Sequence, residues 1–206
     1  EYDVVIVGAG PAGLAASIKL KQLNPDLNVC ILEKGSEVGA HILSGNVFET
    51  RSLDELIPDW QNKNAPIKTK VKKEKFLFLG KKSSLSWPTW LLPSVQKNHN
   101  NYIISLANLC RWLASQAEDL GVEIFPGFAA SKIIYDEKNK VIGVQTGDMG
   151  IDKNENNKDS FEPGLNILAK VTVFSEGCRG HLGKEVISKF KLDNNKSPQQ
   201  YGIGFK

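Results

Sequence analysis

Long apolar runs, paired cysteines and a large excess of one charge are all missing from this chain of 206 residues. No stretch of about 18 apolar residues occurs, which excludes a transmembrane helix in the sequence shown. The cysteines Cys30, Cys110 and Cys178 stand far apart, with no C-x-x-C or His/Cys pairing, so the sequence predicts no metal or iron–sulfur site. The net charge is +3, and because no recognition motif accompanies it, we do not expect nucleic acid as a partner.

What is present is an ordinary globular composition, 41% hydrophobic and 24% charged, in a chain long enough for one large domain. Basic residues gather at residues 68–75 and at Lys81 and Lys82. A solvated lysine-rich surface is the simpler interpretation. The alternative is a patch that faces anionic lipid head groups or an acidic partner.

The start of the chain carries a nucleotide-binding signature. An apolar run at residues 4–7 predicts a buried strand, and three glycines follow it at G-x-G-x-x-G spacing. Residues 14–23 have a helical pattern, and residues 28–32 predict a second strand that ends at Glu33. Strand, glycine-rich turn, helix and spaced acid together predict a β-α-β unit that binds an adenine dinucleotide.

The residue types at this turn have physical reasons. Gly8 allows a tight turn, Gly10 allows the backbone to approach a pyrophosphate, and Gly13 allows the helix to pack closely on the sheet. The anion would lie at the helix N-terminus, where free N–H groups and the helix dipole favour negative charge. Glu33 would accept hydrogen bonds from ribose hydroxyls. This motif alone does not separate FAD from NAD.

The order of the later elements favours FAD. We expect the following elements: a helix over residues 51–60 ended by Pro58, short strands on either side of residues 80–82, a helix over 106–120, a strand over 122–125, a hairpin over 130–146, a polar loop over 147–160 and a last strand over 167–174. A plain NAD domain would continue with regular β-α units. The predicted fold class is therefore α/β, a Rossmann-like FAD-binding domain of the flavin hydroxylase/reductase type with a β-rich insertion.

Two motifs carry a closer resemblance, Gly-Ala-His-Ile-Leu-Ser-Gly at residues 39–45 and Ser-Glu-Gly-Cys at residues 175–178. With the first glycine-rich motif, they resemble the electron-transfer flavoprotein–ubiquinone oxidoreductase family over essentially the whole chain. The resemblance implies an FAD oxidoreductase that takes electrons from reduced electron-transfer flavoprotein and passes them to ubiquinone. It also implies a [4Fe-4S] cluster held by downstream residues, and a monotopic position on the bacterial or mitochondrial inner membrane.

The resemblance further implies how the chain is organised. Residues 1–200 would form the FAD-binding domain, with an insertion at about 61–100 that contacts the membrane or the quinone domain, and residues 201–206 would begin a second domain. The chain would then be the N-terminal portion of a longer enzyme, inactive by itself. A related reductase or hydroxylase of the geranylgeranyl reductase type is the alternative, and downstream cysteines at ferredoxin-like spacing would separate the two.

The resemblance assigns the cofactor contacts residue by residue. They are Gly8, Ala9, Gly10, Pro11, Ala12, Gly13, Glu33, Lys34, His41, Ser44, Gly45, Ala130, Glu176 and Gly177. His41, Ser44 and Gly45 would lie along the flavin, and the backbone of Ala130 would meet the adenine. No catalytic residue is assigned, because electron transfer needs no general base.

Three of the family's positions leave alternatives open. His41 could be a hydrogen-bonded loop histidine. Glu176 could be a turn-forming acid at a strand end. Ser105 stands where relatives often carry a basic residue, which puts a phosphate contact from that position in doubt.

An aromatic run follows the lysine-rich segment. Trp87, Trp90, Leu91 and Leu92 come after the apolar residues 76–79 and have the composition of an interfacial membrane anchor. Packing in a core or a subunit interface is the alternative. The resemblance favours a monotopic membrane contact near residues 42–93.

Overall fold

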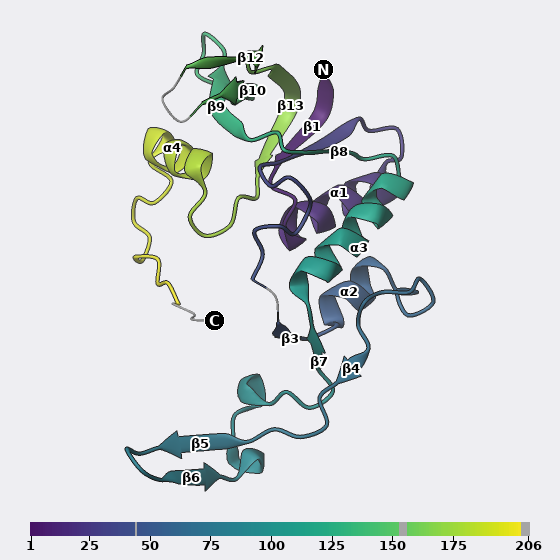
Figure 1. Cartoon of the computed structure of the whole chain (residues 1–206), viewed down its shortest axis with the longest axis vertical. Coiled ribbons are helices and arrows are strands. Elements are labelled where there is room, and N and C mark those ends of the chain that lie inside the picture. The colour runs from purple at the N-terminus through teal and green to yellow at the C-terminus, as the bar shows by residue number, and fades with distance from the viewer. Residues whose placement is uncertain (44, 153–155, 203–206) are drawn as a thin grey trace.

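A six-stranded sheet forms the centre of the molecule in a computed structural model that describes residues 1–43, 45–152 and 156–202 (Figure 1). Its strands are β1 (Tyr2–Val7), β2 (Val29–Glu33), β8 (Glu123–Pro126), β9 (Ala130–Tyr135), β10 (Val141–Thr146) and β13 (Asn166–Phe174). Their order is β8-β2-β1-β13-β10-β9. The first four run parallel, and β10 and β9 are antiparallel additions. The carboxyl ends of the parallel strands therefore meet at one edge.

Successive side chains of β1 pack in two different hydrophobic cores, one on each face of the sheet. The helices are α1 (Pro11–Leu23), α2 (Arg51–Leu56), α3 (Leu106–Asp119) and α4 (His181–Phe190). Successive side chains of a strand point to opposite faces. Val4 and Ile6 pack in the core that α1 and α3 cover, and Val5 and Val7 pack in a second core with Leu182 of α4. The predicted buried strand is thus confirmed.

Residues 68–99, here called the arm, extend away from the central sheet (Figure 1). The elements of the arm and its base are β3 (Asn46–Phe48), β4 (Thr69–Lys70), β5 (Phe76–Leu79), β6 (Ser84–Trp87), the short 3-10 helices η1 (Thr89–Leu91) and η2 (Ser94–Gln96), and β7 (Tyr102–Ile104). A sheet of order β3-β7-β4 joins the arm to the rest, and β5 and β6 form a hairpin of their own. The predicted pair of short strands is confirmed, with residues 80–83 between them.

The prediction of a polar loop over residues 147–160 is wrong. β11 (Met149–Ile151) and β12 (Asn157–Glu162) form an antiparallel pair there. β12 exposes almost all of its side chains, so its sequence has no apolar alternation. The pairing depends on Gly150, whose φ is +71° and where a Cβ would overlap the carbonyl of Ser160. The two backbones therefore approach as closely as only glycine allows.

Two helices of the structure also differ from the sequence predictions. α2 ends at Leu56, short of the predicted residue 60, because the residue before Pro58 is disfavoured in a helical conformation. α4 was not predicted, and it packs beside β9 (Figure 1). Within the described ranges, no helix has the length and apolar character needed to cross a bilayer.

Candidate dinucleotide site

Backbone contacts at Gly8 and Gly13 close the turn from β1 into α1. Gly8 has a φ of +103°, and a Cβ there would lie 2.7 Å from the carbonyl oxygen of Ser175. A Cβ at Gly13 would overlap the carbonyl oxygen of Gly8 and lie 2.7 Å from Ser175 Oγ. The Ser175 hydroxyl lies 3.0 Å from the carbonyl oxygen of Val7 and 3.1 Å from that of Gly8, within donating distance of both. Close packing, rather than local flexibility, fixes the shape of this turn.

The N-terminus of α1 is open at the same place. Gly10 is the N-cap and makes no side-chain cap hydrogen bond, Pro11 follows it, and the first turn of the helix contains no acid. A Cβ at Gly10 would meet nothing within 4 Å, and Pro11 and Ala12 are exposed. The first N–H groups of a helix lack intrahelical partners and favour an anion. The geometry therefore fits a pyrophosphate in front of Gly10.

Glu33 is half-buried at the end of β2, and its carboxylate reaches this turn. Its Oε2 accepts a hydrogen bond from the N–H of Ala9 at 2.9 Å, and its Oε1 accepts one from the N–H of Gly35 at 2.7 Å. A carboxylate has roughly four acceptor positions, so positions are left for ribose hydroxyls. Glu33 thus fixes the backbone of the turn, whether or not it also binds a ribose.

The segment after β8 lies beside Glu33 at the same edge. Pro126 is paired with Glu33, and the N–H of Gly127 donates to the carbonyl of Gly35 at 2.7 Å. Ala130, the predicted adenine contact, is half-buried and begins β9 three residues later. Gly35 and Gly127 were not among the residues predicted from the sequence. The signal that could have found Gly127 is a glycine directly after a strand, and here it has a φ of +83°.

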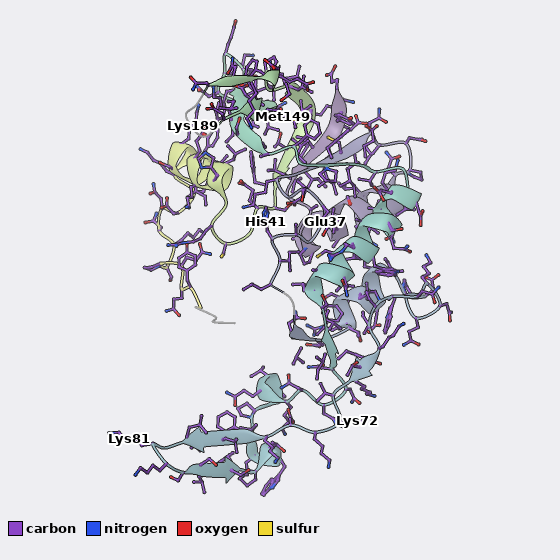
Figure 2. All side chains as sticks on the ribbon, in the orientation of Figure 1. Glu37, His41, Lys72, Lys81, Met149 and Lys189 are labelled. Atoms are coloured by element: carbon purple, nitrogen blue, oxygen red, sulfur yellow. The ribbon has the colours of Figure 1, made fainter. Side chains whose placement is uncertain are left out.

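The predicted flavin-side residues lie on the loop that follows β2. Lys34, His41 and Gly45 are exposed on it, and His41 is labelled in Figure 2. Ser44 lies outside the described residues. Gly39 anchors the loop on α3, because a Cβ there would lie 2.9 Å from the carbonyl oxygen of Ala107. The structure thus attaches this loop to the same core as the glycine-rich turn.

Glu176 has a structural role at the start of α4. Its Oε1 accepts hydrogen bonds from the N–H groups of His181 at 3.1 Å and Leu182 at 3.3 Å, and its Oε2 accepts one from Gly183 at 2.7 Å. The carboxylate therefore caps the N-terminus of α4, where negative charge is favourable. This capping role agrees better with the alternative interpretation, in which Glu176 is a turn-forming acid at a strand end. The next residue, Gly177, is exposed with a φ of +82°.

The two buried cysteines behave as core residues. Burial raises the pKa of Cys30 to about 12. Burial, with the nearby negative charge of Glu33, raises the pKa of Cys110 to about 11. Both thiols therefore stay protonated at neutral pH and are unreactive. Among residues 1–43, 45–152 and 156–202, no group of three or more His, Cys, Asp or Glu side chains is placed to hold a metal ion.

The sheet order and the glycine-rich turn define the class, a Rossmann-like FAD-binding fold. The Thi4 family model matches residues 1–55. The crystal structure of THI4 from Thermovibrio ammonificans has a TM-score of 0.59 at 18% identity and covers 91% of this chain and 62% of its own. The myxobacterial FAD-dependent halogenase CndH has a TM-score of 0.58 at 13% identity and covers 87% of this chain and 38% of its own. These likenesses show the fold.

Closer relatives match the chain over its whole length. It is 54% identical to the probable electron transfer flavoprotein–ubiquinone oxidoreductase of Acinetobacter baylyi and 53% identical to the corresponding protein of Pseudomonas aeruginosa. It is 48% identical to the mitochondrial protein of that name from Bos taurus. The chain spans 37%, 38% and 34% of these three relatives. The chain thus spans somewhat more than a third of the length of these relatives.

Proposed function

We propose that this chain is the N-terminal FAD-binding portion of an enzyme that transfers electrons from reduced electron transfer flavoprotein to ubiquinone. The observation that carries the proposal is the 48–54% identity to proteins of that name over the whole chain. Residues 1–200 would form the FAD-binding domain, with the insertion at about 61–100, and residues 201–206 would begin a second domain. The proposed [4Fe-4S] cluster would be held by residues outside this chain.

The role of this chain is to bind and orient FAD, which supplies reversible uptake and release of electrons when bound. The proposed contacts are those of the sequence analysis: Gly8, Ala9, Gly10, Pro11, Ala12, Gly13, Glu33, Lys34, His41, Ser44, Gly45, Ala130, Glu176 and Gly177. The open α1 N-terminus supports the pyrophosphate position, and the spare acceptor positions of Glu33 support the ribose contact.

The arm is the part that we propose to contact the membrane. It exposes large apolar side chains, with Leu79 79%, Trp90 74% and Val95 91% exposed. Apolar patches of this kind mark interaction sites. The proposed location is the surface of the inner membrane, bacterial or mitochondrial, and the mitochondrial relative supports the second.

The test uses the full-length protein with reduced electron transfer flavoprotein and a soluble ubiquinone analogue. We expect FAD-dependent quinone reduction, and a Glu33→Ala variant that binds FAD at least about tenfold more weakly, because hydrogen bonds to a charged group contribute about 1.5–3 kcal/mol. Glu37→Ala is the matched control, since Glu37 is exposed and, among the described residues, its carboxylate forms a 4.0 Å ion pair with the exposed Arg111. An FAD-replete enzyme that does not reduce the quinone would contradict the function. Unchanged FAD affinity in Glu33→Ala would contradict only the ribose contact.

A further inference from the structure

A cavity of about 330 Å³ lies among the C-terminal ends of α1, α2 and α3. These helices pack together on one side of the sheet (Figure 1). The α1 residues that line the cavity are Ile18 and Gln22. Gln22 comes twelve residues after Gly10, which corresponds to about 18 Å along the helix axis. The cavity is therefore separate from the dinucleotide site, and a ligand bound there would not compete with a pyrophosphate.

Hydrogen bonds between the three helices hold the walls of the cavity in place. Gln22 Nε2 on α1 donates to the carbonyl of Leu56, the last residue of α2, at 2.8 Å. Trp112 Nε1 on α3 donates to the carbonyl of Lys63 at 2.9 Å, which fixes the segment that follows α2. Binding to a site that is already formed costs little reorganisation.

One side of the cavity is apolar. Ile18 and Ile57 are buried and Leu56 is half-buried, and all three line the cavity. The volume is near the lower end for small-molecule sites, which are mostly apolar with a few polar groups. Since a water molecule occupies about 30 Å³ in the liquid, the cavity has room for roughly ten non-hydrogen atoms. Its size and lining fit a small molecule with a short alkyl chain.

The rim of the cavity is negative. Asp119 ends α3, whose last turn contains no basic residue, and carbonyl groups at a helix C-terminus favour a cation. Asp59 also lines the cavity, and Lys63 balances its charge through an ion pair of 3.4 Å. In the part of the chain that the structure describes, no ion pair involves Asp119. Asp119 therefore carries the negative charge that a ligand can neutralise.

A second polar side chain lies beside Asp119. Gln116 is half-buried and lines the cavity, and it stands three residues before Asp119 on α3. Residues three apart lie on one face of a helix. The amide oxygen of Gln116 and the carboxylate of Asp119 are both acceptors, so together they suit a group that carries several N–H donors.

We propose that this cavity binds a small organic monocation, an alkylammonium or alkylguanidinium ion. The alkyl chain lies against Ile18 and Ile57, and the charged group lies at Gln116 and Asp119. An anion would be repelled by Asp119. A bare metal ion would lack ligands, because no group of three or more His, Cys, Asp or Glu among the described residues is placed to hold one. The proposal is independent of the proposed function.

The first test titrates the full-length, FAD-loaded protein with hexylammonium chloride in a calorimeter, with hexanol and sodium hexanoate as probes of equal chain length. We expect saturable binding of one hexylammonium ion, weakened by salt. Hexanol should bind about threefold more weakly or worse, as the loss of an exposed ion pair allows, and hexanoate should not bind. Equal affinity for hexylammonium and hexanol, no saturable binding, or displacement of FAD would overturn the proposal.

The second test repeats the titration on Asp119→Asn, which keeps the shape of the side chain and removes its charge. We expect hexylammonium to bind about threefold more weakly or worse, with the affinity for hexanol unchanged. Glu118→Gln is the matched control, because Glu118 lies in the same turn of α3 and does not line the cavity. The control should bind hexylammonium like the unaltered protein. Equal losses in both variants would mean that the ion senses only the charge of the helix end, and would overturn the proposal.

Discussion

The glycine-rich turn and the arm are opposite kinds of structure in one chain. At the turn, Gly8 and Gly13 fit against Ser175 so closely that neither position has room for a Cβ. In the arm, β5 and β6 form a sheet of their own, and every residue of β6 is exposed. The turn is determined by close contacts within the central part of this chain. The apolar side chains of the arm contact one another, as Phe78 contacts Trp87, and several of them, such as Leu79 and Trp90, stay largely exposed. The comparison separates residues that stabilise the fold from residues available to a partner.

The same substitution in the two regions gives the largest contrast. Leu14 in α1 is fully buried, and Leu79 in β5 is 79% exposed. We expect Leu14→Ala to lower the free energy of unfolding by about 2–5 kcal/mol, because it leaves a cavity in the core. Leu79→Ala should change it by less than about 0.5 kcal/mol. Denaturant unfolding of both variants measures the difference, and similar losses would mean that the arm packs against the rest of the chain.

The next effect tests the close approach of α1 to β1. Gly13→Ala places a methyl group against the Gly8 carbonyl oxygen and Ser175 Oγ. Overpacking of this kind costs about 1–3 kcal/mol, and we expect the free energy of unfolding to fall by that amount. Gly202→Ala, where a Cβ would meet nothing within 4 Å, is the control and should leave unfolding unchanged. An equally stable Gly13→Ala protein would show that the turn can relax.

A smaller effect is expected at the cap of α4. Glu176→Ala removes the carboxylate that accepts three backbone hydrogen bonds. The free energy of unfolding should therefore fall by about 1 kcal/mol. Hydrogen exchange should quicken first at the amides of residues 181–183. Lys184→Ala, on the exposed surface of the same helix, is the control. Unchanged exchange at residues 181–183 would show that the cap does not hold α4.

The sequence predicted the parts of the fold that depend on neighbouring residues. The first strand, the glycine-rich turn, α1 and β2 follow one another within 33 residues, and their patterns are local. α4 was missed because its cap comes from Glu176, before the helix, while the N-cap position is Gly180. A helix signal read from the N-cap residue alone does not include such a partner.

For the candidate site too, the residues within one local sequence pattern could be predicted, and those brought together by strand pairing could not. Gly8, Gly13 and Glu33 could be proposed because their spacing is that of one β-α-β unit. The packing of Gly8 and Gly13 against Ser175 was not visible in that spacing. The edge formed by Gly35 and Gly127 depends on the pairing of β2 with β8, which brings distant segments together. A sequence pattern cannot show which strands are neighbours in a sheet, so this part of the site required the structure.

The central claim is that a pyrophosphate lies in front of Gly10, and Gly10→Ala tests it most directly. A Cβ there meets nothing within 4 Å in the protein, and the φ of −77° is accessible to alanine. We predict a free energy of unfolding within about 0.5 kcal/mol of the unaltered protein. FAD affinity, measured by titration of the full-length apoprotein, should fall about tenfold or more, equivalent to ~1.4 kcal/mol. Unchanged FAD affinity in a stable Gly10→Ala protein would contradict the claim.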